Sequence, residues 1–249
     1  MAVHGEPSQD GISRRNKETA RQVPADMKTL LWYINSSKIF SRLSEKEKTD
    51  LSSMLRTTNV KKGSMIYRIG EKAETVYLLK EGSIKISRLS EDGKELTMDI
   101  LKPGDIFGEM ALSEEGKRED IAEAVEDSYI CDVKKKDFED LISKNPVFSF
   151  SLIKLMGLRI RKIESRFEDV IFKDVCTRVI SILKDIAGKY GAPTKNGKAI
   201  EVKLSHQDIA NLVGATRETV TLELNNLKKE GFISEIKRES IIIPKGRLS

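Results

Sequence analysis

Length, composition and charge restrict the class of protein before any motif is considered. At 249 residues, 39% of them hydrophobic, the chain is longer than a typical single domain of ~100–150 residues and can bury two cores. The 44 basic and 39 acidic residues give a net charge of +5, which allows an anionic partner without requiring one. The two cysteines, Cys131 and Cys176, exclude a disulfide framework and an iron–sulfur cluster held within one chain.

The N-terminal segment shows no pattern typical of a targeting signal. Residues 1–26 are polar and contain no apolar core of the kind that a secretory signal requires. Apolar runs elsewhere are short and interrupted by charge, whereas a membrane span needs ~20 residues. We therefore expect a cytoplasmic protein with no membrane partner, and we predict residues 1–26 to be a disordered arm.

Residues 27–145 are predicted to form a β-roll sensor domain. After a short helical lead-in, in which Leu43–Glu47 resembles a capped helix start, short runs of Ile, Val, Tyr and Met alternate with glycine turns. This spacing is typical of a β-roll, jelly roll or barrel. Val76–Leu79 and Ser83–Ser87 flank one glycine turn. Ser90–Lys94 is predicted to be a hairpin turn, because Asp-Gly readily supplies positive φ.

Residues 146–173 predict a long helix that pairs with a second copy of the chain. Apolar residues recur there at alternating steps of three and four, which is the seam of a two-stranded coiled coil. A helix packed only on its own domain is the alternative, but six consecutive seam positions flanked by basic residues favour a homodimer. The predicted seam consists of Ile153, Met156, Ile160, Ile163, Phe167 and Val170.

Residues 174–249 are predicted to form a DNA-binding domain. A helix over residues 174–190 is followed by a loop that includes Gly191–Pro193, and then by a short strand at Ile200–Leu204. The next segment has the order of signals found in a helix-turn-helix. Two short amphipathic helices are joined there by a glycine turn at Gly214.

Each of these two helices has its own start signal. Ser205 can cap the first helix, with Asp208 three residues later to complete a capping box. Thr216 can cap the second, whose apolar residues share one side. That leaves Arg217, Glu218 and Thr221 pointing outward at its N-terminal end, where a recognition helix meets base edges.

The outward residues have side chains suited to reading DNA. Arg217 can donate to guanine O6 and N7, and Glu218 can accept from a cytosine N4 amine. Strands at Gly231–Glu235 and Ile241–Pro244 are predicted to flank a charged turn and form a wing, whose basic residues would neutralise phosphates and make the affinity salt-dependent. A small helical accessory domain with a solvated basic face is the alternative. The predicted DNA contacts are Ser205, His206, Gln207, Thr216, Arg217, Glu218, Thr219, Thr221, Lys237 and Arg238.

Four motifs together carry a family resemblance that covers nearly everything after residue 28. These motifs are Lys62–Gly63, Val76–Gly82, Leu101–Glu109, and the run from Gln207–Ala210 through Thr216–Val220, and they resemble the cyclic-AMP receptor protein and fumarate–nitrate reductase regulator family. The resemblance implies an α+β fold with an N-terminal, cyclic-nucleotide-binding-like β-roll (a jelly roll), a long dimerisation helix and a C-terminal winged helix-turn-helix. It also implies a transcription regulator, with activation through RNA polymerase, that binds palindromic promoter sites as a homodimer.

The resemblance also implies an effector pocket, but this chain departs from the family pattern there. In cyclic-nucleotide-binding relatives a Gly-Glu pair meets the ribose, and an Arg followed by a small hydroxyl residue and Ala holds the phosphate. Gly108 and Glu109 match the pair, and Arg118 falls at the expected spacing. Glu119 and Asp120 follow it, and their charges would repel a phosphate. We therefore expect Arg118 to pair with a neighbouring acid.

The adenine-contacting positions of the dimer helix depart in the same way. Hydroxyl residues of the cyclic-AMP-responsive members are replaced here by Ile163 and Glu164. We therefore expect either a different small ligand, such as a carboxylate metabolite, or no ligand. A cyclic-AMP-responsive regulator is the alternative.

Other sensor and enzyme chemistries lack their ligands. The predicted β-roll has no histidine, since His4 lies in the arm and His206 in the DNA-binding domain, so we expect no haem, no metal, no other cofactor and no enzyme activity. Cys176 lies near the junction of the dimer helix with the DNA-binding domain, where a packing thiol is the simpler interpretation and a redox switch the alternative. Leu222 stands where family members place a second arginine, so the preferred half-site should differ.

Overall fold

The fold is described from a computed structural model. It describes residues 33–35, 37, 39–112, 116–195, 197–200, 202, 204–237 and 240–247. The predicted arm at residues 1–26 lies outside the described residues. The α+β fold class predicted from the sequence is confirmed.

The first long element is a capped helix, as the sequence predicted. Helix α2 (Glu45–Met54) starts after Ser44, whose Oγ accepts a hydrogen bond from the Glu47 backbone N–H at 3.3 Å. The Glu47 carboxylate accepts in return from the Ser44 backbone N–H at 2.7 Å. This reciprocal pair satisfies two amide groups that a helix start would otherwise leave unbonded. Leu51 anchors the helix in the core beneath it.

Eight strands form two antiparallel four-stranded sheets that face each other. Their shared core takes apolar residues from both sheets, including Leu79 and Phe107 from one and Ile84 and Leu101 from the other. The first sheet has the order β1 (Arg56–Val60), β8 (Ser128–Lys134), β3 (Thr75–Glu81) and β6 (Ile106–Phe107). The second has the order β2 (Met65–Tyr67), β7 (Ile121–Ala124), β4 (Ile84–Leu89) and β5 (Glu95–Leu101).

The two predicted glycine turns have different roles. The Ser90–Lys94 turn joins β4 to β5 as a hairpin, which confirms the prediction, and Gly93 there has a φ of 79°. The turn at Gly82 instead carries the chain from the first sheet to the second, because β3 and β4 do not pair. A Cβ at Gly82 would lie 2.2 Å from the Ser128 Oγ. Only glycine therefore fits the close approach at this crossing.

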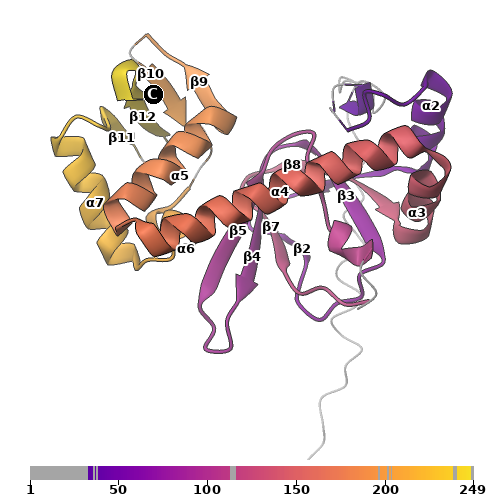
Figure 1. The fold of residues 1–249 in the computed structure, drawn as a ribbon, viewed down its shortest axis with the longest axis horizontal. Helices are drawn as coiled ribbons and strands as arrows, with labels where there is room; N and C mark the ends of the chain where they lie inside the picture. The colour runs from indigo at the N-terminus through magenta and orange to yellow at the C-terminus, as the bar shows by residue number, and fades with distance from the viewer. Residues whose placement is uncertain are drawn as a thin grey trace, which may run out of the picture.

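Two helices follow β8, the last strand of the β-roll. Helix α3 (Lys135–Lys144), which the sequence analysis did not predict, packs Phe138 edge-on against Phe148 at 5.7 Å. Helix α4 (Pro146–Phe172) starts at the cap residue Asn145, whose side chain accepts from the Phe148 N–H. At 27 residues α4 is ~40 Å long. Figure 1 shows it crossing the β-roll and continuing to the C-terminal domain.

The joint between α4 and α5 (Val175–Tyr190) is short and hydrogen-bonded. Only Lys173 and Asp174 separate the two helices. The Lys173 backbone N–H donates to the Asp169 carbonyl at 3.0 Å, and its carbonyl accepts from Arg178 at 2.9 Å. Asp174 caps α5 by accepting from the Thr177 N–H at 2.8 Å. These bonds therefore restrict the backbone conformation of the two joining residues.

The C-terminal sheet corrects two predictions made for the segment before the helix-turn-helix. Gly191–Pro193, expected as a loop, is strand β9, and β10 (Gly197–Ile200) begins earlier than the strand expected at Ile200–Leu204. The sheet has four strands in the order β11 (Glu235–Lys237), β12 (Ser240–Pro244), β10 and β9. The Gly, Ala and Pro of β9 have low strand propensity, so pairing with β10 decides its conformation.

Candidate DNA-binding surface and effector cavity

The helix-turn-helix is built by local capping. Helix α6 (His206–Val213) follows Ser205, which forms with Asp208 the capping box expected from the sequence. Gly214 ends α6 in the left-handed region, with a φ of 66°. Helix α7 (Arg217–Lys229) follows Thr216, whose Oγ1 accepts from the Thr219 N–H at 3.2 Å. Residue type at these positions thus determines where both helices begin and end.

One side of α7 is buried and the other faces solvent. Val220, Leu224 and Leu227 lie in a core that they share with α5 and α6. Arg217 and Glu218, in the first turn, are exposed. Arg217 and Glu218 therefore point outward, as the sequence predicted.

Other predicted DNA contacts are engaged in hydrogen bonds within the domain. His206 Nδ1 lies 2.9 Å from the Thr221 Oγ1, and Thr221 also donates to the Arg217 carbonyl at 2.8 Å. Gln207 donates to the Asn211 side-chain oxygen at 2.7 Å. Thr219 is half-buried, with its hydroxyl 2.9 Å from that of Thr216. Of these bonds, the His206–Thr221 contact joins α6 to α7, and the others lie within one helix or its cap.

The first strand of the predicted wing is β11 at Glu235–Lys237, not the expected Gly231–Glu235, because residues 231–234 form turns after α7. Lys237 lies on β11, whereas Arg238 lies outside the described residues. Lys228 and Lys229 are exposed in the last turn of α7. Leu222 is 59% exposed on the same helix. An apolar side chain therefore occupies the position where the family pattern has arginine.

Cys176 is held as a thiol. Burial raises its pKa to about 11, and the Glu223 carboxylate beside it acts in the same direction. Because only the thiolate reacts readily with peroxide, this environment disfavours the redox switch that was the alternative interpretation.

A cavity of about 320 Å³ lies between the β-roll and α4. We call it the effector cavity. Gly108, Glu109 and Ile163 of the predicted pocket line it, whereas Arg118 and Glu164 are not among its lining residues. The residues that line it are Tyr67, Ile86, Arg88, Met98, Asp99, Leu101, Phe107, Gly108, Glu109, Met110, Asp120, Arg159, Lys162, Ile163 and Arg166.

Arg118 does not form the expected ion pair among its described contacts. It is 3% exposed, and its guanidinium donates to the Gly108 and Thr75 carbonyls, the former at 2.9 Å. The same group lies 4.2 Å from the centre of the Tyr67 ring, within cation–π range. Two of its nitrogens thus donate to the β-roll backbone, and they hold the loop at Gly108 in place.

The two carboxylates after Arg118 have separate partners. Glu119 accepts from Arg88 at 2.6 Å near the surface. Asp120 lines the effector cavity and accepts from the Tyr67 hydroxyl at 3.2 Å. Burial raises the pKa of Asp120 above its ordinary value, and nearby Glu109 adds to the effect. A phosphate placed beside this carboxylate would raise it further.

Three cations of α4 border the effector cavity, and each already has a partner. Arg159 pairs with Glu109. Lys162 lies 2.6 Å from the Asp99 carboxylate. Arg166 donates to the Met98 carbonyl. Burial lowers the pKa of Lys162 to about 8, although Asp99 opposes the shift.

Asp99 also links the effector cavity to the DNA-binding domain. Besides Lys162 of α4, it accepts from Lys189 of α5 at 3.3 Å. Tyr190, the next residue, donates to the Ile100 carbonyl at 2.7 Å. One strand of the β-roll, β5, thus holds both the cavity wall and the end of α5.

A second link, centred on Lys85, was missed from the sequence. The Lys85 ammonium is nearly buried and lies 3.0 Å from Glu95 and Glu123 of the β-roll. It also lies 3.5 Å from Asp208, the capping residue of α6. Asn211 donates to Glu95 at 3.0 Å beside it. The one signal in the sequence is a lysine between two isoleucines of a strand, which does not identify its partners.

The predicted dimer seam forms an exposed apolar row along α4. Five of its six members, Ile153, Ile160, Ile163, Phe167 and Val170, are each more than half exposed. Met156 packs partly against the β-roll core. An apolar row of this length on a single helix is typical of an interaction surface.

The described residues show neither a membrane-spanning helix nor a metal site. None of the helices in that part of the chain has the length and apolar character needed to cross a bilayer. Within the same residues, no group of three His, Cys, Asp or Glu side chains is arranged to hold a metal ion.

Each of the two domains matches a known family model. The family model for the cyclic nucleotide-binding domain matches residues 57–145, and that for the Crp-like helix-turn-helix domain matches residues 177–246. The anaerobic regulatory protein of Bacillus subtilis is 32% identical over 202 residues, which are 79% of this chain and 85% of that protein. A CRP-like cAMP-activated global transcriptional regulator of Mycobacterium tuberculosis is 30% identical over 195 residues, 78% of this chain and 86% of the relative.

A solved structure agrees with the fold. The c-di-GMP responsive global regulator CLP of Xanthomonas campestris superimposes with a TM-score of 0.70 at 20% identity, over 81% of this chain and 99% of that one. The fold, the exposed recognition helix and these matches define a DNA-binding transcription regulator. The chain belongs to the cyclic-AMP receptor protein and fumarate–nitrate reductase regulator family, as its motifs predicted.

Proposed function

We propose that this regulator acts as a homodimer that reads a two-fold symmetric DNA site through the first turn of α7. The observation that carries the proposal is the exposure of Arg217 and Glu218 at the start of a helix whose other side is fully packed. Pairing of two α4 helices along the exposed seam would bring two such helices to half-sites about one helical turn apart. Lys228, Lys229 and Lys237 would contact phosphates and give a salt-dependent affinity.

The preferred half-site should differ from the familiar one. Leu222 cannot donate to guanine, so one base contact expected from the family pattern is lost. Such a contact contributes ~1–3 kcal/mol of discrimination. Thr221 lies one residue before Leu222, and its methyl group can instead contact a thymine methyl.

The effector cavity is proposed to bind a small molecule that carries a carboxylate. Arg159 and Lys162 line it together with their present partners, Glu109 and Asp99. A ligand carboxylate that replaces Asp99 beside Lys162 leaves Asp99 paired with Lys189, which limits the cost of binding. Cyclic AMP fits less well, because Arg118 is committed to backbone carbonyls and Asp120 would face the phosphate.

Activation of transcription through contact with RNA polymerase, in the cytoplasm and without catalytic activity, is the outcome that the family implies.

Selection of binding sites from a random duplex library, at fixed salt with and without cyclic AMP, tests the proposal. We expect one palindrome, with the same sequence and enrichment in both selections. A palindrome that appears only with cyclic AMP would contradict the proposed effector class and support a cyclic-AMP-responsive regulator. Enrichment of single, non-repeated half-sites would contradict the homodimer.

A further inference from the structure

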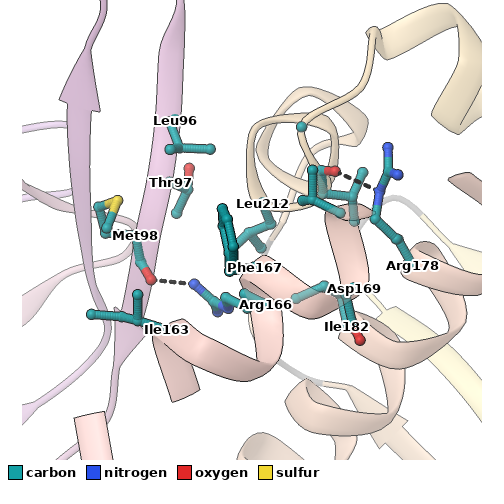
Figure 2. Close-up of a pocket in the computed structure, with 13 residues that line it drawn as sticks. Leu96, Thr97, Met98, Ile163, Arg166, Phe167, Asp169, Arg178, Ile182 and Leu212 are labelled. Carbon is teal, nitrogen blue, oxygen red and sulfur yellow. Dashed lines mark hydrogen bonds between the residues drawn. The ribbon is translucent and has the colours of Figure 1, made fainter. Parts of the chain in front are cut away.

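A second cavity lies at the junction of the two domains. It measures about 220 Å³, and α4, β5, α5 and α6 all contribute to its walls. We call it the junction cavity. Figure 2 shows Phe167 of α4 near its centre, with Leu96 of β5 on one side and Leu212 of α6 on the other.

The charged residues around the junction cavity are engaged elsewhere. Arg166 donates to the Met98 carbonyl, and Arg178 donates to the Val213 carbonyl at 3.0 Å (Figure 2). The Asp169 carboxylate lies 2.6 Å from Lys173. The remaining lining is mainly aliphatic and aromatic. The cavity therefore suits an apolar group rather than an ion.

The α4 wall of the junction cavity has the geometry of a coiled-coil hole. A hole consists of four residues of one helix around a seam position, and it receives one side chain of the facing helix. The α4 residues Ile163, Arg166, Phe167 and Val170 line the cavity, and their spacing of i, i+3, i+4 and i+7 is that of such a hole. In a parallel, in-register pair, the same seam position of the second helix lies opposite it.

We infer that the partner's Phe167 enters this cavity and that the dimer interface therefore includes the DNA-binding domain. This inference rests on the proposed homodimer. A cavity of ~150 Å³ can hold benzene, so this one is large enough for a phenyl ring. Phe167 is 67% exposed, and insertion of each copy into the other would bury both rings. The partner's Phe167 then contacts Leu96 of the β-roll and Leu212 of α6 at once.

The inferred contact would also affect the helix-turn-helix. Leu212 belongs to the first helix of the helix-turn-helix and is buried in the domain core. A ring packed against it from the partner would hold α6 in one position relative to the paired α4 helices. Dimerisation and placement of the recognition helix would then depend on the same contact.

Substitution of an exposed lining residue tests the inference without damage to a core. Leu96 lines the cavity and is 47% exposed; Leu89, on the neighbouring strand β4, is also 47% exposed but does not line it. We expect Leu96→Asp to raise the dimer dissociation constant about tenfold or more, measured by sedimentation, and Leu89→Asp to leave it unchanged. Ile160→Asp, on the seam but outside the cavity, serves as the positive control.

The outcomes separate the inference from the proposed function. Dissociation by Ile160→Asp together with an unchanged Leu96→Asp dimer would overturn the inference, leave the homodimer intact and leave the cavity for a small apolar ligand. A wild-type chain that sediments as a monomer at micromolar concentration would overturn both.

A cross-linking experiment tests the contact with α6 directly. In a Cys176→Ser background, one preparation carries Phe167→Cys and the other Leu212→Cys, and the two are mixed and oxidised. We expect a disulfide-linked peptide pair that joins position 167 to position 212, formed only in the mixture. Because each chain carries one of the two substitutions, that link must be between copies. A mixture that forms only links between two copies of position 167 would contradict the inference.

Discussion

The helix-turn-helix and the effector cavity use their polar side chains differently. In the helix-turn-helix, caps and short-range bonds fix the backbone while Arg217 and Glu218 stay exposed for a partner. In the effector cavity, Arg159 and Lys162 are already paired with acids of the β-roll. The first region is thus prepared for contact with DNA, whereas a ligand in the second must exchange with existing partners. The predictions below test this contrast.

The largest effect is expected at Lys85, which joins the β-roll to the helix-turn-helix. Removal of one partner of a buried ion pair costs ~3–5 kcal/mol, and the partial exposure of Glu95 and Glu123 reduces this to ~2–3 kcal/mol. Lys85→Met should lower the free energy of unfolding by that amount in urea. Lys94→Met, which removes an exposed pair with Asp92, should leave the free energy of unfolding nearly unchanged. Equal losses would show that Lys85 is not a special link.

Arg217→Ala tests the DNA-binding side of the contrast. Loss of a bidentate contact to guanine should weaken specific binding by ~1–3 kcal/mol and leave nonspecific binding unchanged. Titration of the selected palindrome and of a scrambled duplex measures both. Lys228→Ala, at the other end of α7, should weaken the two affinities equally. A variant at position 217 that behaves like the lysine variant would refute the base-reading role.

Arg118→Met tests the cavity side. The Gly108 and Thr75 carbonyls would lose a buried charged donor, so the free energy of unfolding should fall by ~1–3 kcal/mol. Arg88→Met, which breaks an exposed pair with Glu119, should cost less than ~1 kcal/mol. If the Arg118 variant keeps full stability but loses effector binding, Arg118 is a ligand contact and our assignment is wrong.

The smallest effect is expected from Asp120 and depends on pH. Burial raises the pKa of Asp120, so the folded state binds more protons than the unfolded state between the ordinary pKa and the raised one. Stability contributed by this group therefore falls as pH rises through that window. Asp120→Asn should be more stable than wild type at pH 7, with the difference vanishing in acid below the ordinary pKa.

Asp127 supplies the control of opposite sign. Its hydrogen bond from Lys61 lowers the pKa of Asp127, so Asp127→Asn should be less stable than wild type at pH 7. Urea unfolding at a series of pH values measures both variants. Parallel curves for the two would contradict the assigned environments.

Local signals in the sequence were enough to predict the helix-turn-helix. Ser205 and Asp208 are three residues apart, and Gly214 and Thr216 act on the adjacent backbone, so each feature is legible in a short window. The β4–β5 hairpin was predicted for the same reason. Which of the exposed side chains contact DNA stays a prediction.

Long-range pairing was not predictable from these patterns. Lys85 and Asp208 meet although 123 positions apart in the numbering, and no local preference specifies that ion pair. The Gly82 turn has the composition of a hairpin turn, yet the chain crosses between sheets there and approaches Ser128, which is distant in sequence. Strand β9 forms through its pairing with β10 despite its unfavourable residues.

Only two residues join α4 to α5, so a rotation at this joint displaces the C-terminal domain by a distance that grows along α5. Helix α5, with 16 residues, is ~24 Å long. A rotation of ~15° at Lys173 and Asp174, the size of the subunit rotation in haemoglobin, would move its far end by ~6 Å and would break the bonds that Lys189 and Tyr190 form with β5. That distance is nearly two steps of ~3.4 Å along a DNA strand. A small change in the angle of this joint therefore suffices to put two recognition helices in or out of register with successive turns of a duplex.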